Sequence, residues 1–189
     1  MIRQLIAGLV LACLAATAHA AFDVDQLMAA LAQHKGGRAK FVEKRTLAVL
    51  DRPLVATGEM TYTPPDRLEK RTLTPKPETL LLDKDVVSIE RDKRTYSINL
   101  ANRPEALAFV GSIRSTLAGN RAALEKDYTL QLSGNADHWV LTLSPTSPQI
   151  AALLQRITVS GSRDQIHTID YLLADGDRSE LTIEPLAPR

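Results

Sequence analysis

The stretch that decides the fold reads TGEMTYTPPDRLEK over residues 57–70. In its first half, the apolar side chains of Met60 and Tyr62 alternate with the polar side chains of Glu59, Thr61 and Thr63. Successive side chains of a strand point to opposite faces, so this alternation predicts a strand with one apolar and one solvated face. The Pro-Pro-Asp sequence at 64–66 is a turn signal, after which the chain can return as the next strand.

The same alternation recurs along most of the remaining chain. It returns at Tyr96, Ile98 and Leu100, at Tyr128, Leu130 and Leu132, at Trp139, Leu141 and Leu143, and at Leu181 and Ile183. Turn signals such as those at 91–93 and 175–177 separate these runs, and about eleven short strands fit the template. Short connections make neighbouring strands antiparallel. A sheet of that many strands tends to curl on itself or to split into two layers.

Three segments with helical spacing interrupt the strands. Residues 24–31 carry an apolar stripe and begin after Asp23, which can cap them together with Gln26. A second helix is predicted from about Pro104 to Leu117, because proline is favoured in a first helical turn. The sequence at 147–148 predicts a third, short helix that carries Ile150, Leu153 and Leu154. The predicted order is helix, six strands, helix, two strands, helix and three strands.

The N-terminus has the three parts of a secretory signal peptide. Met1-Ile2-Arg3 precedes a run of small and apolar residues from Leu5 to Ala18, and Ala18-His19-Ala20 forms the exit site. We therefore expect residues 1–20 to be removed and residues 21–189 to form a single domain outside the cytoplasm. A retained lipid anchor on Cys13, the only cysteine, is the competing interpretation.

Composition and motifs argue against several classes of function. The chain has 23 basic and 22 acidic residues, whereas a general nucleic-acid binder needs a basic surface. The histidines of the mature chain, His34, His138 and His167, lack metal-ligand spacing, so we expect no metal site. No serine-hydrolase elbow or phosphate-binding glycine loop is present, and we expect neither an enzyme nor a cofactor.

The order of the strands and their turns resembles the LolA family, the periplasmic carriers of outer-membrane lipoproteins in Gram-negative bacteria. The resemblance rests on the sequences at 41–45, 53–62, 64–68 and Pro75, and on those at 157–159, 164–169 and 177–179. It implies a mainly β, α+β fold: an open, unclosed antiparallel β-barrel of about eleven strands with helices covering its mouth. It also implies a carrier that takes an acylated protein from an inner-membrane releasing transporter to an outer-membrane acceptor.

One departure from the family concerns control of the helical lid. The arginine that tethers the lid of family members aligns with Pro64, which cannot donate the same hydrogen bonds. We therefore expect the closed state to rest mainly on apolar contact. The departure also leaves open whether the cargo is a lipoprotein or another molecule with acyl chains.

Period-two alternation and the resemblance together predict the residues of a hydrophobic cavity and its lid. The cavity set is Phe41, Met60, Tyr62, Leu68, Leu82, Ile89, Tyr96, Ile98, Leu141 and Leu143. The lid set, on the second helix, is Leu107, Phe109, Val110, Ile113 and Leu117. From helical spacing alone, such a stripe is more typical of ordinary core than of a lid.

The expected partners are acyl chains of lipoproteins or other lipids, a donor transporter and an acceptor; we expect a monomer that binds no nucleic acid. Two alternatives stay open: an outer-membrane receptor lipoprotein of the same fold anchored at Cys13, and a periplasmic enzyme acting on lipid or glycan. The charged residues at 67–71 are interpreted as an edge strand that resists aggregation, or as a surface for an anionic membrane or an acidic partner.

Overall fold

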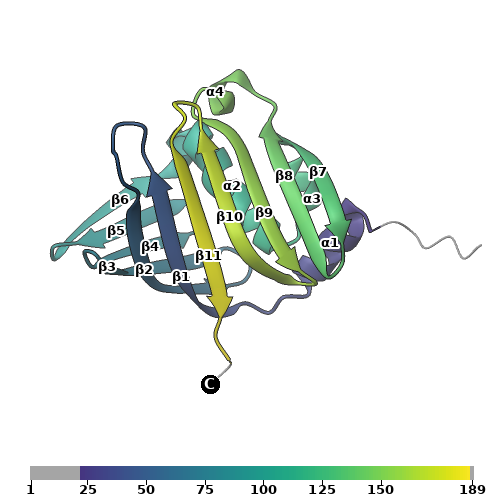
Figure 1. Cartoon of the computed structure of the whole chain (residues 1–189), viewed down its shortest axis with the longest axis horizontal. Coiled ribbons are helices and arrows are strands. Elements are labelled where there is room, and N and C mark those ends of the chain that lie inside the picture. Colours follow the sequence, from purple (N-terminus) through teal and green to yellow (C-terminus); the bar gives the residue numbers. More distant parts are fainter. Residues whose placement is uncertain (1–21, 188–189) are drawn as a thin grey trace, which may run out of the picture.

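The computed structural model describes residues 22–187 and has at its centre one antiparallel sheet of eleven strands (Figure 1). The strands lie in the order β6-β5-β4-β3-β2-β1-β11-β10-β9-β8-β7, so β6 and β7 are the edges and are not paired with each other. In Figure 1 the β3–β6 strands run across the direction of β8–β11, which shows how strongly the sheet coils. The open barrel of about eleven strands is thus confirmed.

Two meanders build this sheet outward from its centre. The first consists of β1 (Gly37–Thr46), β2 (Leu54–Thr63), β3 (Arg67–Thr74), β4 (Glu78–Asp83), β5 (Val86–Arg91) and β6 (Arg94–Asn99). The second consists of β7 (Tyr128–Asn135), β8 (His138–Pro145), β9 (Leu154–Ser162), β10 (Gln165–Leu173) and β11 (Arg178–Pro185). The pairing of β1 with β11 joins the two meanders. The β5–β6 hairpin turns at Asp92 and Lys93, whose φ angles of 52° and 61° match the tight turns that suit twisted strands.

The helices lie mainly between the two meanders and at the start of the described chain. The first, α1 (Val24–Ala32), begins with the predicted capping box, in which Asp23 and Gln26 bond each other's backbone amides. After a 3₁₀ turn, η1 (Leu100–Asn102), come α2 (Pro104–Leu117) and α3 (Arg121–Leu124). In Figure 1, α2 lies behind the second meander.

The short helix α4 (Pro148–Ala151) corrects part of the sequence interpretation. Ser147 caps it and Ile150 is buried, as expected for its apolar position. The helix ends before Leu153, however, which is exposed, and Leu154 is already the first residue of β9. Both residues satisfied the helical spacing, but Leu154 is buried as part of the strand and Leu153 makes no comparable contact.

The inner face of the sheet carries two apolar clusters. Residues directly opposite each other in an antiparallel pair point to the same face, so the register follows this face from strand to strand. The larger cluster joins β1 and β7–β11 to α1, α3 and α4, and includes Leu27, Leu31, Phe41, Leu124, Trp139, Leu141, Leu143 and Ile157. The smaller cluster joins β4 and β5 to η1 and α2, and its buried members are Leu82, Val87 and Leu100.

Candidate functional site

A cavity of about 400 Å³ lies between α2 and the inner face of the sheet, where the two apolar clusters meet. The cavity is present because the side chains of α2 pack against both clusters but do not fill the space between them. Phe109 of α2 contacts Tyr171 of β10, with ring centroids 5.1 Å apart, and both rings line the cavity. The other apolar lining residues are Leu47, Met60, Leu68, Leu80, Leu82, Val87, Val110, Ile113, Ile169, Leu173 and Leu181.

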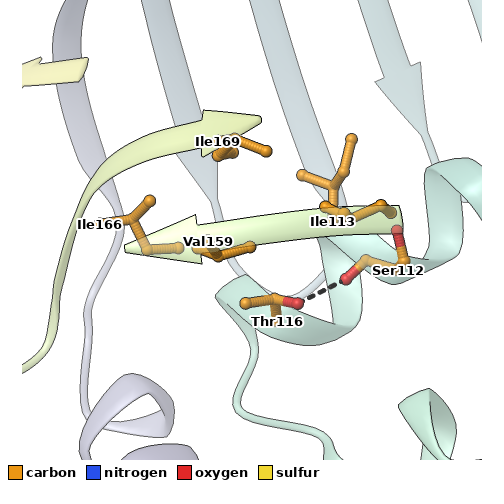
Figure 2. Close-up of a pocket in the computed structure, with 7 residues that line it drawn as sticks. Ser112, Ile113, Thr116, Val159, Ile166 and Ile169 are labelled. Carbon is orange, nitrogen blue, oxygen red and sulfur yellow. Dashed lines mark hydrogen bonds between the residues drawn. The ribbon is translucent and has the colours of Figure 1, made fainter. Parts of the chain in front are cut away.

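The second half of α2 packs on the sheet next to this cavity (Figure 2). There Ser112, Ile113 and Thr116 lie against Val159, Ile166 and Ile169 of β9 and β10, around a void of only about 10 Å³. Thr116 Oγ1 donates to the carbonyl oxygen of Ser112 and Ser112 Oγ to that of Phe109, each at 2.7 Å. The two buried hydroxyls are therefore satisfied inside the helix, and apolar contact holds this part of α2 to the sheet.

A polar tether also holds α2, in addition to the apolar contact on which we expected the closed state mainly to rest. Arg114 Nη1 donates to the backbone oxygen of Lys84 at 2.9 Å and lies 3.4 Å from Asp85 Oδ1. Both partners belong to the β4–β5 turn, in which Lys84 has a φ of 53°. The lid helix thus carries its own arginine, whereas the family's arginine would have come from the position of Pro64.

One corner of the otherwise apolar cavity is charged. Glu43 on β1, only 7% exposed, accepts hydrogen bonds from Lys70 Nζ at 2.5 Å, from Arg45 Nε at 2.9 Å and from Ser179 Oγ at 2.9 Å. All four residues line the cavity. Burial by itself raises the pKa of Glu43, but the hydrogen bonds and charges of Lys70 and Arg45 outweigh it and hold the pKa below its ordinary value.

Tyr171 lies beside this charged corner, opposite Ser179 in the β10–β11 pair. Burial raises the pKa of its hydroxyl, and the negative charge of Glu43 raises it further. The phenol is therefore neutral and keeps its proton, and Tyr171 lines the cavity beside the charged corner.

The structure distributes the predicted cavity residues over four environments. Met60, Leu68 and Leu82 line the cavity. Phe41, Tyr62, Leu141 and Leu143 are buried but do not line this cavity, and Phe41, Leu141 and Leu143 belong to the larger cluster. Ile89 packs against the smaller cluster.

Tyr96 and Ile98 do not line the cavity, and their assignment to it is corrected. They pair with Ile89 and Val87, so they share the inner face, yet they remain 51% and 46% exposed. The physical reason is their place on β6: an edge strand has a neighbour on one side only.

The predicted lid residues all lie on α2 but contact different neighbours. Phe109, Val110 and Ile113 line the cavity. Leu107 and Val110 pack against the smaller cluster, whereas Phe109 and Leu117 pack against the larger one. The helix therefore bridges the two clusters above the cavity.

Sequence reasoning missed the charged corner, although the signal was present. Period-two alternation that places Phe41 on the inner face also places Glu43 and Arg45 there, and Leu68 does the same for Lys70. The interpretation of 67–71 as an edge strand is wrong, because β3 lies between β2 and β4.

A second, polar concavity lies at the β9–β10 turn and contains His138 and His167. His167 Nε2 is 2.9 Å from Ser162 Oγ, and His34 Nδ1 is 3.4 Å from Asp164 Oδ2. Within residues 22–187, His167 has no hydrogen bond to a carboxylate that would orient it as in a catalytic triad. The same part of the chain holds no group of three or more histidine, cysteine, aspartate or glutamate residues placed to bind a metal.

The predicted signal peptide and Cys13 lie outside the described residues. Within residues 22–187, no helix has the length and apolar character needed to cross a membrane.

Comparison with known proteins adds the family. The profile of a family described as outer membrane lipoprotein carrier protein LolA-like matches residues 15–184. Among solved structures, a LolA superfamily protein from Nitrosomonas europaea is 10% identical, with a TM-score of 0.43 over 87% of this chain and 93% of that chain.

Two further solved structures are similar. For the MucA/MucB complex of Pseudomonas aeruginosa, identity is 16% and the TM-score 0.46, over 88% of this chain and 57% of that chain. LprF from Mycobacterium bovis is 11% identical, with a TM-score of 0.36 over 88% of this chain and 96% of that chain. Among curated proteins, no significant match is found.

Proposed function

Because the chain belongs to the family of LolA-like outer membrane lipoprotein carrier proteins, we propose that it is a periplasmic carrier of acyl chains. It shields the chains of a lipoprotein, or of another lipidated cargo, between an inner-membrane releasing transporter and an outer-membrane acceptor. It performs no covalent chemistry and needs no cofactor. The observation that carries this proposal is the cavity of about 400 Å³ beneath α2, whose walls are apolar except at one corner.

The energetics of such a cavity suit a carrier. Transfer of each methylene from water into an apolar site stabilises by ~0.8 kcal/mol, so several methylenes suffice to keep a chain bound in transit. Apolar walls bind through contact and have few directional bonds, and a receptor with a more apolar site can therefore take the chain onward. We expect α2 to move during loading, because it lines the cavity and packs against both clusters.

Binding of a fluorescent fatty acid tests the proposal. We expect the wild-type chain to bind the probe and Ile113→Asp to weaken binding, because Ile113 lines the cavity from α2. Leu153→Asp is the matched control: Leu153 is 53% exposed outside the cavity, so this variant should bind as wild type does. Circular dichroism should show the same β-sheet signal for all three.

Failure of the wild-type chain to bind any acyl probe would refute the carrier. Ile113→Asp that binds as tightly as wild type would make α2 ordinary core. Native mass spectrometry of the protein recovered from the periplasm should show a bound acylated molecule.

Mass spectrometry of the mature N-terminus separates the carrier from the anchored receptor. We expect an N-terminus at Ala21. A diacylated Cys13 would instead identify an outer-membrane receptor lipoprotein of the same fold.

A further inference from the structure

Some positions on the inner face of the sheet carry charged side chains, although their neighbours on adjacent strands are apolar. Lys70 on β3 lies between Met60 of β2 and Leu80 of β4 in the cavity wall. Glu43 on β1 lies opposite Leu181 of β11. Removing an ion from water costs several kcal/mol of free energy. Apolar side chains at this corner would therefore stabilise the fold at least as well as the charged ones.

The charged corner has two cations and one carboxylate, and the cations have more hydrogen-bond donors than the carboxylate accepts. Two cations, Lys70 and Arg45, share Glu43. Among residues 22–187, Glu43 is the only side-chain hydrogen-bond partner of either cation. Lys70 also lies over the ring of Phe41, with Nζ 4.9 Å from its centroid. The two Nη atoms of Arg45 and the remaining ammonium hydrogens of Lys70 are therefore available to a ligand.

The other charged residues that line the cavity, Arg178 and Asp177, have ion-pair or hydrogen-bond partners of their own. Arg178 forms ion pairs with Asp170 and Glu180. Asp177 accepts a hydrogen bond from the backbone amide of Ala48 at 2.8 Å. The surplus of cationic donors is thus concentrated at Arg45 and Lys70.

The size of the cavity limits what it can enclose. Its volume of about 400 Å³ lies at the lower end of the range of ~300–1,000 Å³ typical of small-ligand pockets. A single acyl chain suits that volume better than several chains side by side.

We infer that the cavity takes a single-chain amphiphile with an anionic headgroup, a carboxylate or a phosphate. The head lies at Arg45 and Lys70, where it accepts hydrogen bonds from their donors that Glu43 does not use. The tail lies among the apolar side chains that line the rest of the cavity, such as Leu80 and Val110. This inference rests on the proposed function and narrows its cargo.

The test compares a charged probe with its uncharged counterpart. Wild-type protein is titrated with fluorescent cis-parinaric acid and with the methyl ester of the same acid, at a pH where the carboxylate is ionised. We expect the acid to bind about tenfold more tightly, which corresponds to ~1.4 kcal/mol for the headgroup contact. The ester has the same tail, so the ratio isolates the contribution of the charge.

Variants of the corner should remove that preference. Lys70→Met keeps a flexible stem of similar length, and Arg45→Gln changes a side chain that is 54% exposed and so leaves folding intact. Either substitution should bring the acid and the ester to nearly equal affinity. Arg67→Gln, at an exposed ion pair with Asp83 outside the cavity, is the control and should keep the wild-type ratio.

Competition distinguishes the two possible headgroups. Dodecanoate, dodecyl phosphate and dodecanol are compared as displacers of the bound probe; the better of the two anions identifies the headgroup, and dodecanol should be the weakest. Equal binding of acid and ester by wild type, or an unchanged preference in both corner variants, would overturn the inference and leave the carrier intact. Binding of neither probe would overturn both.

Discussion

The two meanders of the sheet bury their inner faces to very different extents. In the second meander, Trp139, Leu141 and Leu143 are at most 1% exposed, because α1, α3 and α4 pack over β7–β9. In the first meander, only α2 and the 3₁₀ turn η1 pack against β4 and β5 among the described residues, and Tyr96 on β6 remains half exposed. The same alternating pattern thus produces a sealed core on one side and a cavity on the other. The difference locates stability mainly in the second meander and binding in the cavity that lies between the two meanders.

Truncation of one leucine in each meander should produce the largest contrast. Leu141→Ala removes a fully buried side chain from the sealed core and should lower the free energy of unfolding by ~2–5 kcal/mol. Leu80→Ala, in the cavity wall, should cost only about 1–2 kcal/mol, since part of its surface already faces open space. Urea unfolding measures both. Equal losses would mean that the two meanders are packed alike.

The charged corner should give the cavity side its own pH dependence. Because the pKa of Glu43 is lowered in the folded protein, its ionised form stabilises the fold above the ordinary carboxyl pKa of ~4.3. That contribution is lost as the pH falls from there through the lower folded pKa. Glu43→Gln should therefore cost about 1–3 kcal/mol at neutral pH, by leaving Lys70 without its carboxylate, and should flatten the loss of stability in acid.

Urea midpoints across the acidic range test this expectation. Glu90→Gln, which alters an exposed carboxylate on β5, should retain the wild-type slope. A Glu43→Gln variant that is still as acid-sensitive as wild type would place the titrating group elsewhere.

The tether of α2 should have the smallest effect on global stability and a clear local one. Arg114→Gln removes the contacts to Lys84 and Asp85 in the β4–β5 turn, and such partly exposed contacts contribute under ~1 kcal/mol. Amide hydrogen exchange in α2 should nevertheless become faster, because local opening needs less free energy. Arg121→Gln, which removes ion pairs with Asp25 and Glu125, is the control. Exchange in α2 that is unchanged by Arg114→Gln would show that apolar contact alone holds the helix.

Much of the fold follows from local patterns. The alternation at Met60 and Tyr62 and the turn signals between runs predict the strands, and the predicted bounds of α2 are those observed. The α4 segment shows the limit of this reasoning, since Leu154 fits both a helical and an alternating pattern. There the pairing of β9 with β8 and β10 decides the conformation.

The candidate site was less accessible from the sequence. Alternation places a side chain on a face, but its burial depends on what covers that face, and for this reason Tyr96 and Ile98 were assigned wrongly. The charged corner could be predicted only with knowledge of the strand pairing. Glu43 contacts Ser179, 136 residues away, because β1 pairs with β11.

The sequence by itself determined the strands, their order along the chain and the side chains that share the inner face. A period of two and the residues of tight turns depend only on neighbouring residues. Only the tertiary structure decided which part of that face became sealed core and which became the cavity. That outcome depends on where the helices come to lie on a coiled sheet. It also decided that Glu43, Lys70 and Arg45 share one corner of the cavity, because their meeting is set by strand register and not by distance along the chain.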